Sequence, residues 1–249
     1  MERGRGQGPP APDLRGHRAR GSLGFRHAAQ AFDRAVRLTA MGANANATRL
    51  SIFPLTGAVL YPGLQLPLHI FEPRYRAMVS DSLARDRRIA MIQPQSPVEG
   101  APLFRVGCVG RIADVEALED GRYNIVLEGL SRFRIVRELD VTTPFRQVEA
   151  ELIVDDMDEA LSAVERASFE REARSFADAQ GYAVDWDSVG RLDDMSLING
   201  VSQIAPFDAA AKQALLEADT LAARCELLVQ LMQFFGKHDG DDGGRVTLQ

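Results

Sequence analysis

Residues 66–78 read LPLHIFEPRYRAM, and the stretch changes character in its middle. The first half alternates side chains toward two faces, which is typical of a strand. Pro73 has a backbone φ suited to the first turn of a helix, and it lacks an N–H group that would be unpaired there. Tyr75, Met78 and Val79 then follow at the spacing of one helix face. The stretch therefore predicts a strand that passes directly into a helix over residues 73–86.

The same stretch gathers a histidine, a glutamate and two arginines, so it could be either a site or a junction. His69 alternates with apolar neighbours and is expected on the opposite face from theirs. Glu72 precedes Arg76 by four residues, the favourable order for an ion pair on a helix. We interpret the cluster as structural, with Phe71 buried and Arg74 on the exposed side of the helix. A recognition role for His69 or Arg74 is the alternative.

Outward from this stretch, residues 49–153 mostly follow a period of two, with turn signals between the runs. An Asp-Gly pair at positions 120–121 predicts a hairpin turn. Seven short strands with one intervening helix predict a curled, barrel-like sheet. The expected strands are residues 49–55, 65–71, 88–94, 107–116, 123–129, 132–139 and 145–153.

After residue 153 the pattern becomes helical. Asp155, Asp156 and Asp158 are expected at a helix start, where the helix dipole favours acids; a metal site is the less favoured alternative. Asp208 is expected to cap one later helix, and Asp219 or Thr220 the last one. Pro206 and Gly236 are expected to end helices. The expected buried stripes comprise Leu197, Ile198, Val201, Ile204 and Ala205, and then Leu221, Cys225, Leu228, Leu231 and Phe235, widened by Leu227 and Phe234.

The charge of the chain is unevenly distributed. The 249 residues carry a formal net charge of −6, but residues 1–40 hold eight arginines against three acids, a net of +5. The remaining residues therefore carry −11, which argues against a general nucleic-acid binder. Cys108 and Cys225 are expected as buried thiols. The longest apolar run, residues 227–235, is too short to span a membrane, so a cytoplasmic location is expected.

Three blocks of sequence carry a family resemblance. Residues 53–79 (FPLTGAVLYPGLQLPLHIFEPRYRAMV), 103–139 and 197–232 together resemble the N-terminal substrate-binding domain of Lon proteases, in the variant found in stand-alone bacterial Lon-domain proteins. The resemblance covers residues 49–236. The signature positions, expected to be structural, are Pro54, Leu55, Pro62, Gly63, Pro67, Leu68, Ile70, Phe71, Glu72, Arg74, Tyr75, Gly107, Gly110, Gly129 and Arg132.

The resemblance implies an α+β fold. A PUA-like β pseudo-barrel is expected over residues 49–153 and a helical subdomain over residues 154–236, between a disordered basic extension (1–48) and a disordered tail (237–249). It also implies a protein-recognition function, with no binding residue assigned. Protein substrates, partner proteins or a resident Lon protease are the expected partners.

An enzyme is the least favoured reading. The phosphate-binding pattern G-x-x-x-x-G-K-[ST] is absent, since Gly236-Lys237 is followed by His238. The Ser–Lys dyad of Lon proteases needs a placed lysine, and the chain has only Lys212 and Lys237. We therefore expect no catalytic residue, cofactor or metal.

Nucleic-acid binding is the alternative function. PUA-like barrels of other families bind RNA, and Arg132, Arg134 and Arg137 flank Phe133 in one predicted strand. A solvated strand face explains alternating arginines equally well, and the acidic body argues against an RNA-binding surface.

Overall fold

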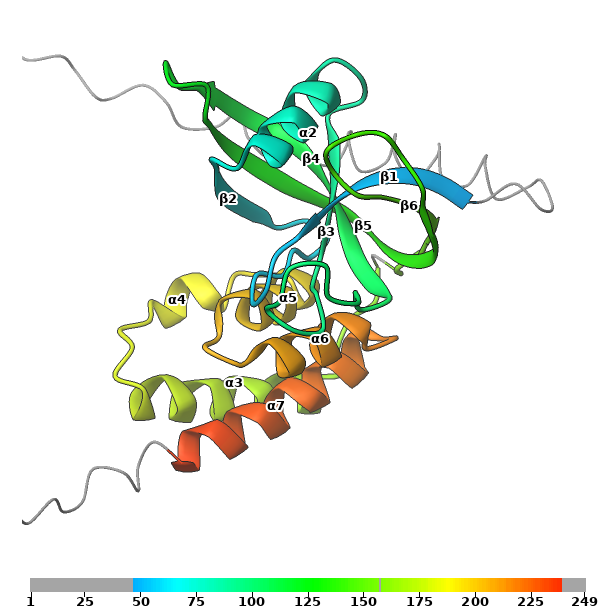
Figure 1. The fold of residues 1–249 in the computed structure, drawn as a ribbon. Coiled ribbons are helices and arrows are strands. Elements are labelled where there is room, and N and C mark those ends of the chain that lie inside the picture. Colours follow the sequence, from blue (N-terminus) through cyan, green and yellow to red (C-terminus); the bar gives the residue numbers. More distant parts are fainter. Residues whose placement is uncertain (1–46, 157, 239–249) are drawn as a thin grey trace, which may run out of the picture. The chain divides into compact units, whose positions relative to one another are not determined.

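The structure is a computed structural model, and it describes residues 47–156 and 158–238. Most of the expected extension (1–48), including residues 1–46, and most of the expected tail, residues 239–249, lie outside the described residues. The described part combines a sheet with helices, which confirms the predicted α+β class (Figure 1).

Within the described residues, six strands form one sheet, in the order β2-β5-β4-β3-β1-β6. β6 also pairs with β5, so five strands close into a barrel and β2 is added to the side of β5. β1 and β3 run parallel, and the other pairs are antiparallel. The strands are β1 (Ala47–Pro54), β2 (Gln65–Ile70), β3 (Arg88–Ile92), β4 (Val106–Ala117), β5 (Tyr123–Leu139) and β6 (Gln147–Leu152).

The long strand β5 replaces two of the expected strands. Residues 123–129 and 132–139 were predicted as separate strands, and this was wrong because no turn interrupts them. Val109 pairs with Ser131 while Gly110 pairs with Gly129, so Leu130 is the extra residue of a bulge. The bulge bends β5, whose first half pairs with β2 and whose second half pairs with β6. One bent strand thereby closes the barrel and also holds β2.

The hairpin turn between β4 and β5 is confirmed. Leu118 donates its N–H to the Arg122 carbonyl at 2.9 Å. Gly121 has φ +78°, a left-handed conformation that glycine adopts without strain. This turn fixes the register that places the outer side chains of β4 opposite those of β5.

The strand-to-helix junction forms as predicted, with two corrections. Helix α2 (Pro73–Leu83) follows β2 and buries Tyr75, Met78 and Val79. The expected Glu72–Arg76 pair is wrong, because Glu72 bonds Arg74 instead. Phe71 is not buried; it is 60% exposed, because it continues the outward-facing side of β2.

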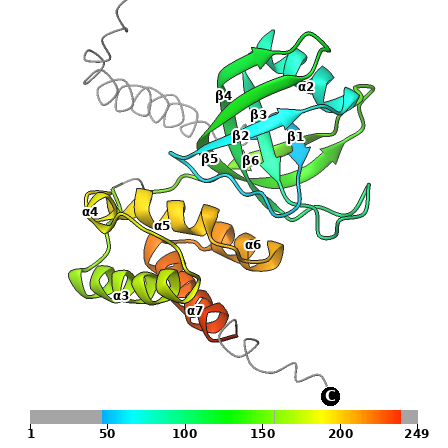
Figure 2. The same ribbon diagram turned by 90° about the vertical axis from the view of Figure 1, so that its left-hand side faces the viewer.

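The remaining helices pack around one apolar cluster, and α3 and α7 lie side by side (Figure 2). Asp208 accepts a hydrogen bond from the Ala211 N–H, and Thr220 accepts one from the Ala223 N–H, so both predicted caps are confirmed. The helices are α3 (Ala163–Ala179), α4 (Trp186–Val189), α5 (Asp194–Ile204), α6 (Ala209–Glu217) and α7 (Leu221–His238).

Several helical details were predicted wrongly. Asp155, Asp156 and Asp158 lie in an irregular segment, because Ser162 and Glu165 form a capping box that starts α3 later. Two residues of the predicted stripes are not buried, since Ile204 and Phe234 are 78% and 56% exposed, whereas Ala205 and Phe235 at the ends of the stripes contact the core. Helix α7 continues past Gly236 to His238.

The buried Arg132 joins the sheet to the helices. Its guanidinium contacts Asp155 and donates to the carbonyls of Leu216 and Ala218, each at 2.7 Å. These carbonyls lie at the C-terminal end of α6, where a helix favours a cation. Arg224 of α7 reaches the same end through the Leu215 carbonyl. Two arginines therefore neutralise one helix end and connect β5, α6 and α7.

Candidate functional site on the outer face of the sheet

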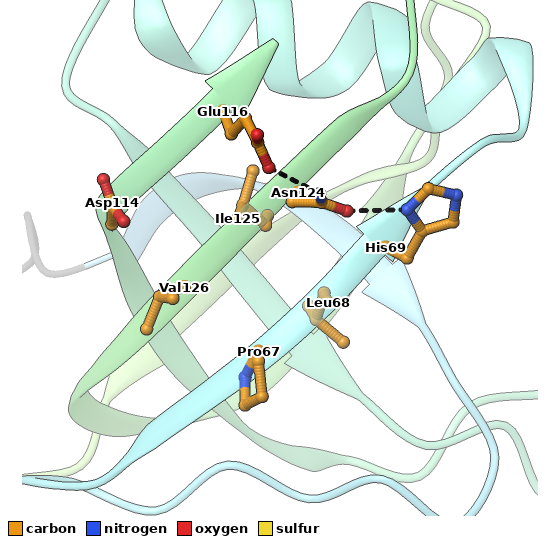
Figure 3. Close-up of a pocket in the computed structure, with 8 residues that line it drawn as sticks. All are labelled: Pro67, Leu68, His69, Asp114, Glu116, Asn124, Ile125 and Val126. Atoms are coloured by element: carbon orange, nitrogen blue, oxygen red, sulfur yellow. Dashed lines mark hydrogen bonds between the residues drawn. The ribbon is translucent and has the colours of Figure 1, made fainter. Parts of the chain in front are cut away.

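An open hollow of about 400 Å³ lies on the outer face of β2, β5 and β4 (Figure 3). It lies over the half of β5 that pairs with β2. The residues that line it are Pro67, Leu68 and His69 of β2, Asn124, Ile125 and Val126 of β5, and Asp114 and Glu116 of β4.

Strand register builds the hollow as two rows of side chains across three strands. Asp114, Val126 and Pro67 are direct cross-strand partners and form the first row. Glu116, Asn124 and His69 form the second row in the same way. Side chains in register on adjacent strands are close enough to touch. Both rows therefore carry an acid on β4, while their β2 ends are apolar in one row and an imidazole in the other.

Hydrogen bonds hold the second row in place (Figure 3). Asn124 donates from Nδ2 to Glu116 Oε2 at 2.7 Å, and its Oδ1 lies 2.7 Å from His69 Nδ1. Arg122 lies 3.2 Å from His69 Nε2. Since an amide oxygen only accepts and a guanidinium only donates, this network assigns the proton to Nδ1 of a neutral imidazole. The row is thus a preorganised polar strip.

The first row is apolar at two of its three positions. Pro67 is exposed and Val126 is half-buried. Asp114 accepts a hydrogen bond from the Val115 N–H at 2.9 Å. Within the described residues, neither Asp114 nor Glu116 has an ion-pair partner, whereas Arg111 pairs with Glu128 beside them. The hollow therefore offers apolar surface next to two uncompensated carboxylates.

An exposed aromatic ring borders the hollow. Phe71 stacks on His69 with ring centroids 6.2 Å apart and an interplanar angle of 25°. A ring held in this way presents apolar area to solvent, and aromatic residues of this kind are frequent anchors at protein interfaces. Phe71 was predicted to lie in the core, but the structure places it at the rim of the candidate site.

The outer edge of β2 is poorly suited to pairing with an added strand. Pro67 has no N–H group, which is a common way of protecting an edge strand. The Gln65 carbonyl already accepts a hydrogen bond from Gln203 Nε2 at 2.9 Å. Recognition by strand addition is therefore disfavoured, and the side-chain face of the sheet is the better binding surface.

The signature positions divide into those near the hollow and those far from it. Pro67 and Leu68 line it, and Phe71 borders it. Glu72 and Arg74 do not line it; they form an ion pair at the start of α2. Pro54, Leu55 and Gly63 lie partly buried or exposed at the end of β1 and before β2. The remaining signature positions are buried, namely Pro62, Ile70, Tyr75, Gly107, Gly110, Gly129 and Arg132.

Sequence reasoning missed five residues of the hollow: Asp114, Glu116, Asn124, Ile125 and Val126. Part of the signal was present, because residues 114–116 and 123–125 alternate on the two sides of the Asp-Gly turn, although Val126 breaks the alternation. A hairpin turn fixes the register of its strands, so the outward positions of both runs could have been placed opposite one another.

Other chemistry finds little support in the described residues. They contain no group of three or more His, Cys, Asp or Glu side chains that could hold a metal ion, Asp155, Asp156 and Asp158 included. Cys108 and Cys225 are free and buried as predicted, and burial raises the pKa of the Cys225 thiol to about 11. Lys212 bonds the Gly57 and Gln203 carbonyls, and burial lowers its pKa.

The predicted basic strand face is not assembled. Arg132 is buried in the joint described above, and Phe133 is fully buried. Arg137 pairs with Glu149. Arg134 and Arg137 are both exposed, but Arg137 is held by its acidic partner. The nucleic-acid alternative therefore loses Arg132 and Phe133, two of the four residues on which it depended.

Across residues 47–156 and 158–238, no helix is both long and apolar enough to cross a bilayer.

Comparison with known proteins shows that the chain is similar to part of several Lon proteases. Lon protease 2 of Sorangium cellulosum (strain So ce56) is 27% identical over 199 residues, and Lon protease of Anaeromyxobacter dehalogenans (strain 2CP-C) is 26% identical over 197 residues. These alignments cover 75% and 74% of this chain. They cover 25% and 23% of the relatives, so the chain spans about a quarter of their length.

Two solved structures share the fold. The Lon N-terminal domain protein from Xanthomonas campestris superposes with a TM-score of 0.58 at 23% identity, covering 74% of this chain and 98% of that one. The N-terminal domain of Mycobacterium avium complex Lon protease also gives 0.58, at 18% identity, covering 75% and 98%. The model of the ATP-dependent protease La (LON) substrate-binding domain matches residues 49–233. This chain therefore belongs to the LON substrate-binding domain family.

Proposed function

We propose that the chain is a non-catalytic protein-recognition module that binds exposed segments of other proteins through the hollow on β2, β5 and β4. The family supports the class of function, because the matching domain is described as substrate-binding. The observation that carries the location is the open hollow, which combines the apolar surface of Pro67 and Val126 with a polar row and the exposed Phe71 ring.

The shape and chemistry of the hollow suit an unfolded segment. An extended chain exposes side chains of both kinds together with unpaired backbone groups. Apolar side chains can pack on Val126, while the carboxylates of Asp114 and Glu116 can accept backbone N–H groups. A folded partner would bury its apolar residues and have fewer of these groups to offer. Cytoplasmic action alongside a resident Lon protease is part of the proposal, as is the lack of ATP hydrolysis and peptide cleavage.

The test compares binding of the full chain to one model protein in two states. The model protein is labelled with a fluorophore and used either native or reduced and carboxymethylated, which keeps it unfolded. We expect fluorescence anisotropy to report binding of the unfolded form only. Val126→Thr and Phe71→Ser together should weaken this binding by about five-fold or more, because each removes apolar contact area.

Val154→Thr is the matched control, since Val154 is 67% exposed and lies beyond β6, outside the hollow. It should leave binding unchanged. Equal binding of both forms of the model protein, or an unchanged affinity in the Val126/Phe71 double variant, would refute the assignment of the hollow.

A further inference from the structure

Among residues 47–156 and 158–238, the two carboxylates of the hollow have no cationic partner. The neighbouring cations are already engaged: Arg111 pairs with Glu128, and Arg122 pairs with Asp120 and contacts His69. Asp114 and Glu116, which stand on one strand and face the same hollow, are left without one in the described part of the chain. Two like charges at one surface attract a cation that their surroundings do not supply.

The apolar part of the hollow lies beside the carboxylates on the adjoining strands. From β4 across β5 to β2, each row passes from an acid to less charged side chains. Adjacent strands are about 4.8 Å apart, so the acid and the β2 end of a row are separated by roughly 10 Å. Side chains two residues apart in an extended segment are about 7 Å apart, and an arginine or lysine side chain easily adds the remaining reach.

We infer that the hollow selects segments in which an arginine or lysine lies within two or three residues of an aromatic or branched apolar residue. The cation reaches Asp114 and Glu116, and the apolar side chain packs on Val126 and Pro67 near the Phe71 ring. This inference rests on the proposed function and adds the substrate class to it. The net charge of −11 over residues 41–249 acts in the same direction, since it attracts basic segments at long range.

The test uses three labelled peptides that share one phenylalanine and one valine in a Gly/Ser background. They carry three arginines, three glutamines or three glutamates. We expect the full chain to bind the arginine peptide most tightly and the glutamate peptide least tightly. Asp114→Asn with Glu116→Gln should weaken the arginine peptide about 3- to 10-fold, the range of two exposed ion pairs. The same double variant should leave the glutamine peptide within about two-fold.

The matched control neutralises two exposed acids elsewhere, Asp140→Asn and Glu151→Gln, with the same change of net charge. It should keep the arginine preference. Loss of that preference in this control, or its survival in the Asp114/Glu116 variant, overturns the inference.

The glutamine peptide separates the two proposals. If it binds and Val126→Thr weakens it, while the arginine and glutamate peptides bind equally, the hollow recognises segments without charge selection and only this inference fails. If no peptide binds, the proposed function fails with it.

Discussion

Arg132 is the position where a single substitution should most affect the connection between sheet and helices. Replacement by methionine keeps much of the side-chain length but removes the guanidinium. In the native protein this group contacts Asp155 through Nε and Nη2, at 2.9 and 2.5 Å, and donates twice from Nη1 to carbonyls at the end of α6. The side chain is only 3% exposed, so water cannot replace these bonds.

The cost follows from what the substitution leaves behind. The carboxylate of Asp155 is 14% exposed, and its buried Oδ2 atom has no hydrogen-bond partner in the described part of the native protein. Removing one partner of a buried ion pair costs about 3–5 kcal/mol, because the remaining charge is uncompensated. The two α6 carbonyls would add to this cost. Since whole domains are stabilised by only about 5–15 kcal/mol, Arg132→Met should unfold a measurable fraction of the protein.

Urea denaturation followed by circular dichroism measures this loss. Arg134→Met is the control, because Arg134 is exposed on the same strand, and it should change the free energy of unfolding by less than about 0.5 kcal/mol. Adding Asp155→Asn to Arg132→Met should recover part of the loss, since it removes the orphaned charge. If Arg132→Met lowered the free energy of unfolding by less than about 1 kcal/mol, the Arg132 contacts would not hold the sheet and helices together as argued.

Three further predictions concern packing and ionisation. Gly129→Ala should destabilise the fold by about 2 kcal/mol or more, because a Cβ there would overlap the Tyr61 carbonyl backbone; thermal unfolding tests this, and a near-native melting temperature would contradict it. Phe71→Ala should cost under about 1 kcal/mol in the same assay, since the ring is exposed, and a larger cost would restore the buried assignment. The free energy of unfolding should fall as pH rises from about 9 toward 11, because burial raises the pKa of Cys225 to about 11 while the unfolded thiol ionises near 8.5. Denaturant titrations at several pH values test this, and Cys225→Ala should lessen the fall without abolishing it, because burial also raises the pKa of the Cys108 thiol.

Much of the fold could be predicted because its signals are local. Pro73 after an alternating run marked the start of α2, and Asp120-Gly121 marked the hairpin. Asp208 and Thr220 marked helix starts by their side-chain chemistry. Each of these signals depends on a few neighbouring residues, and the backbone follows them irrespective of what packs nearby.

The failures share a different cause, since they depend on contacts distant in sequence. The bulge at Leu130 joins two predicted strands because β5 must pair with three others, and no turn residue signals it. Arg132 looked like part of an exposed basic face, yet a partner 23 residues away and carbonyls more than 80 residues away bury it. Phe71 looked like core by residue type alone. Such tertiary effects override what side-chain type and spacing indicate.

The residues that identify the family and the residues that line the hollow are largely different sets, for a physical reason. Gly107 and Gly129 leave room for neighbouring backbone and rings, and Arg132 satisfies a helix end, so the fold depends on each of them. Asp114, Glu116 and Asn124 are exposed, and their replacement leaves no cavity and no buried charge. The sheet therefore holds these positions in register whatever side chains occupy them. Binding preference can be changed at the hollow at small cost in stability, whereas changes at buried signature positions such as Gly107, Gly129 and Arg132 should alter binding only by altering the fold.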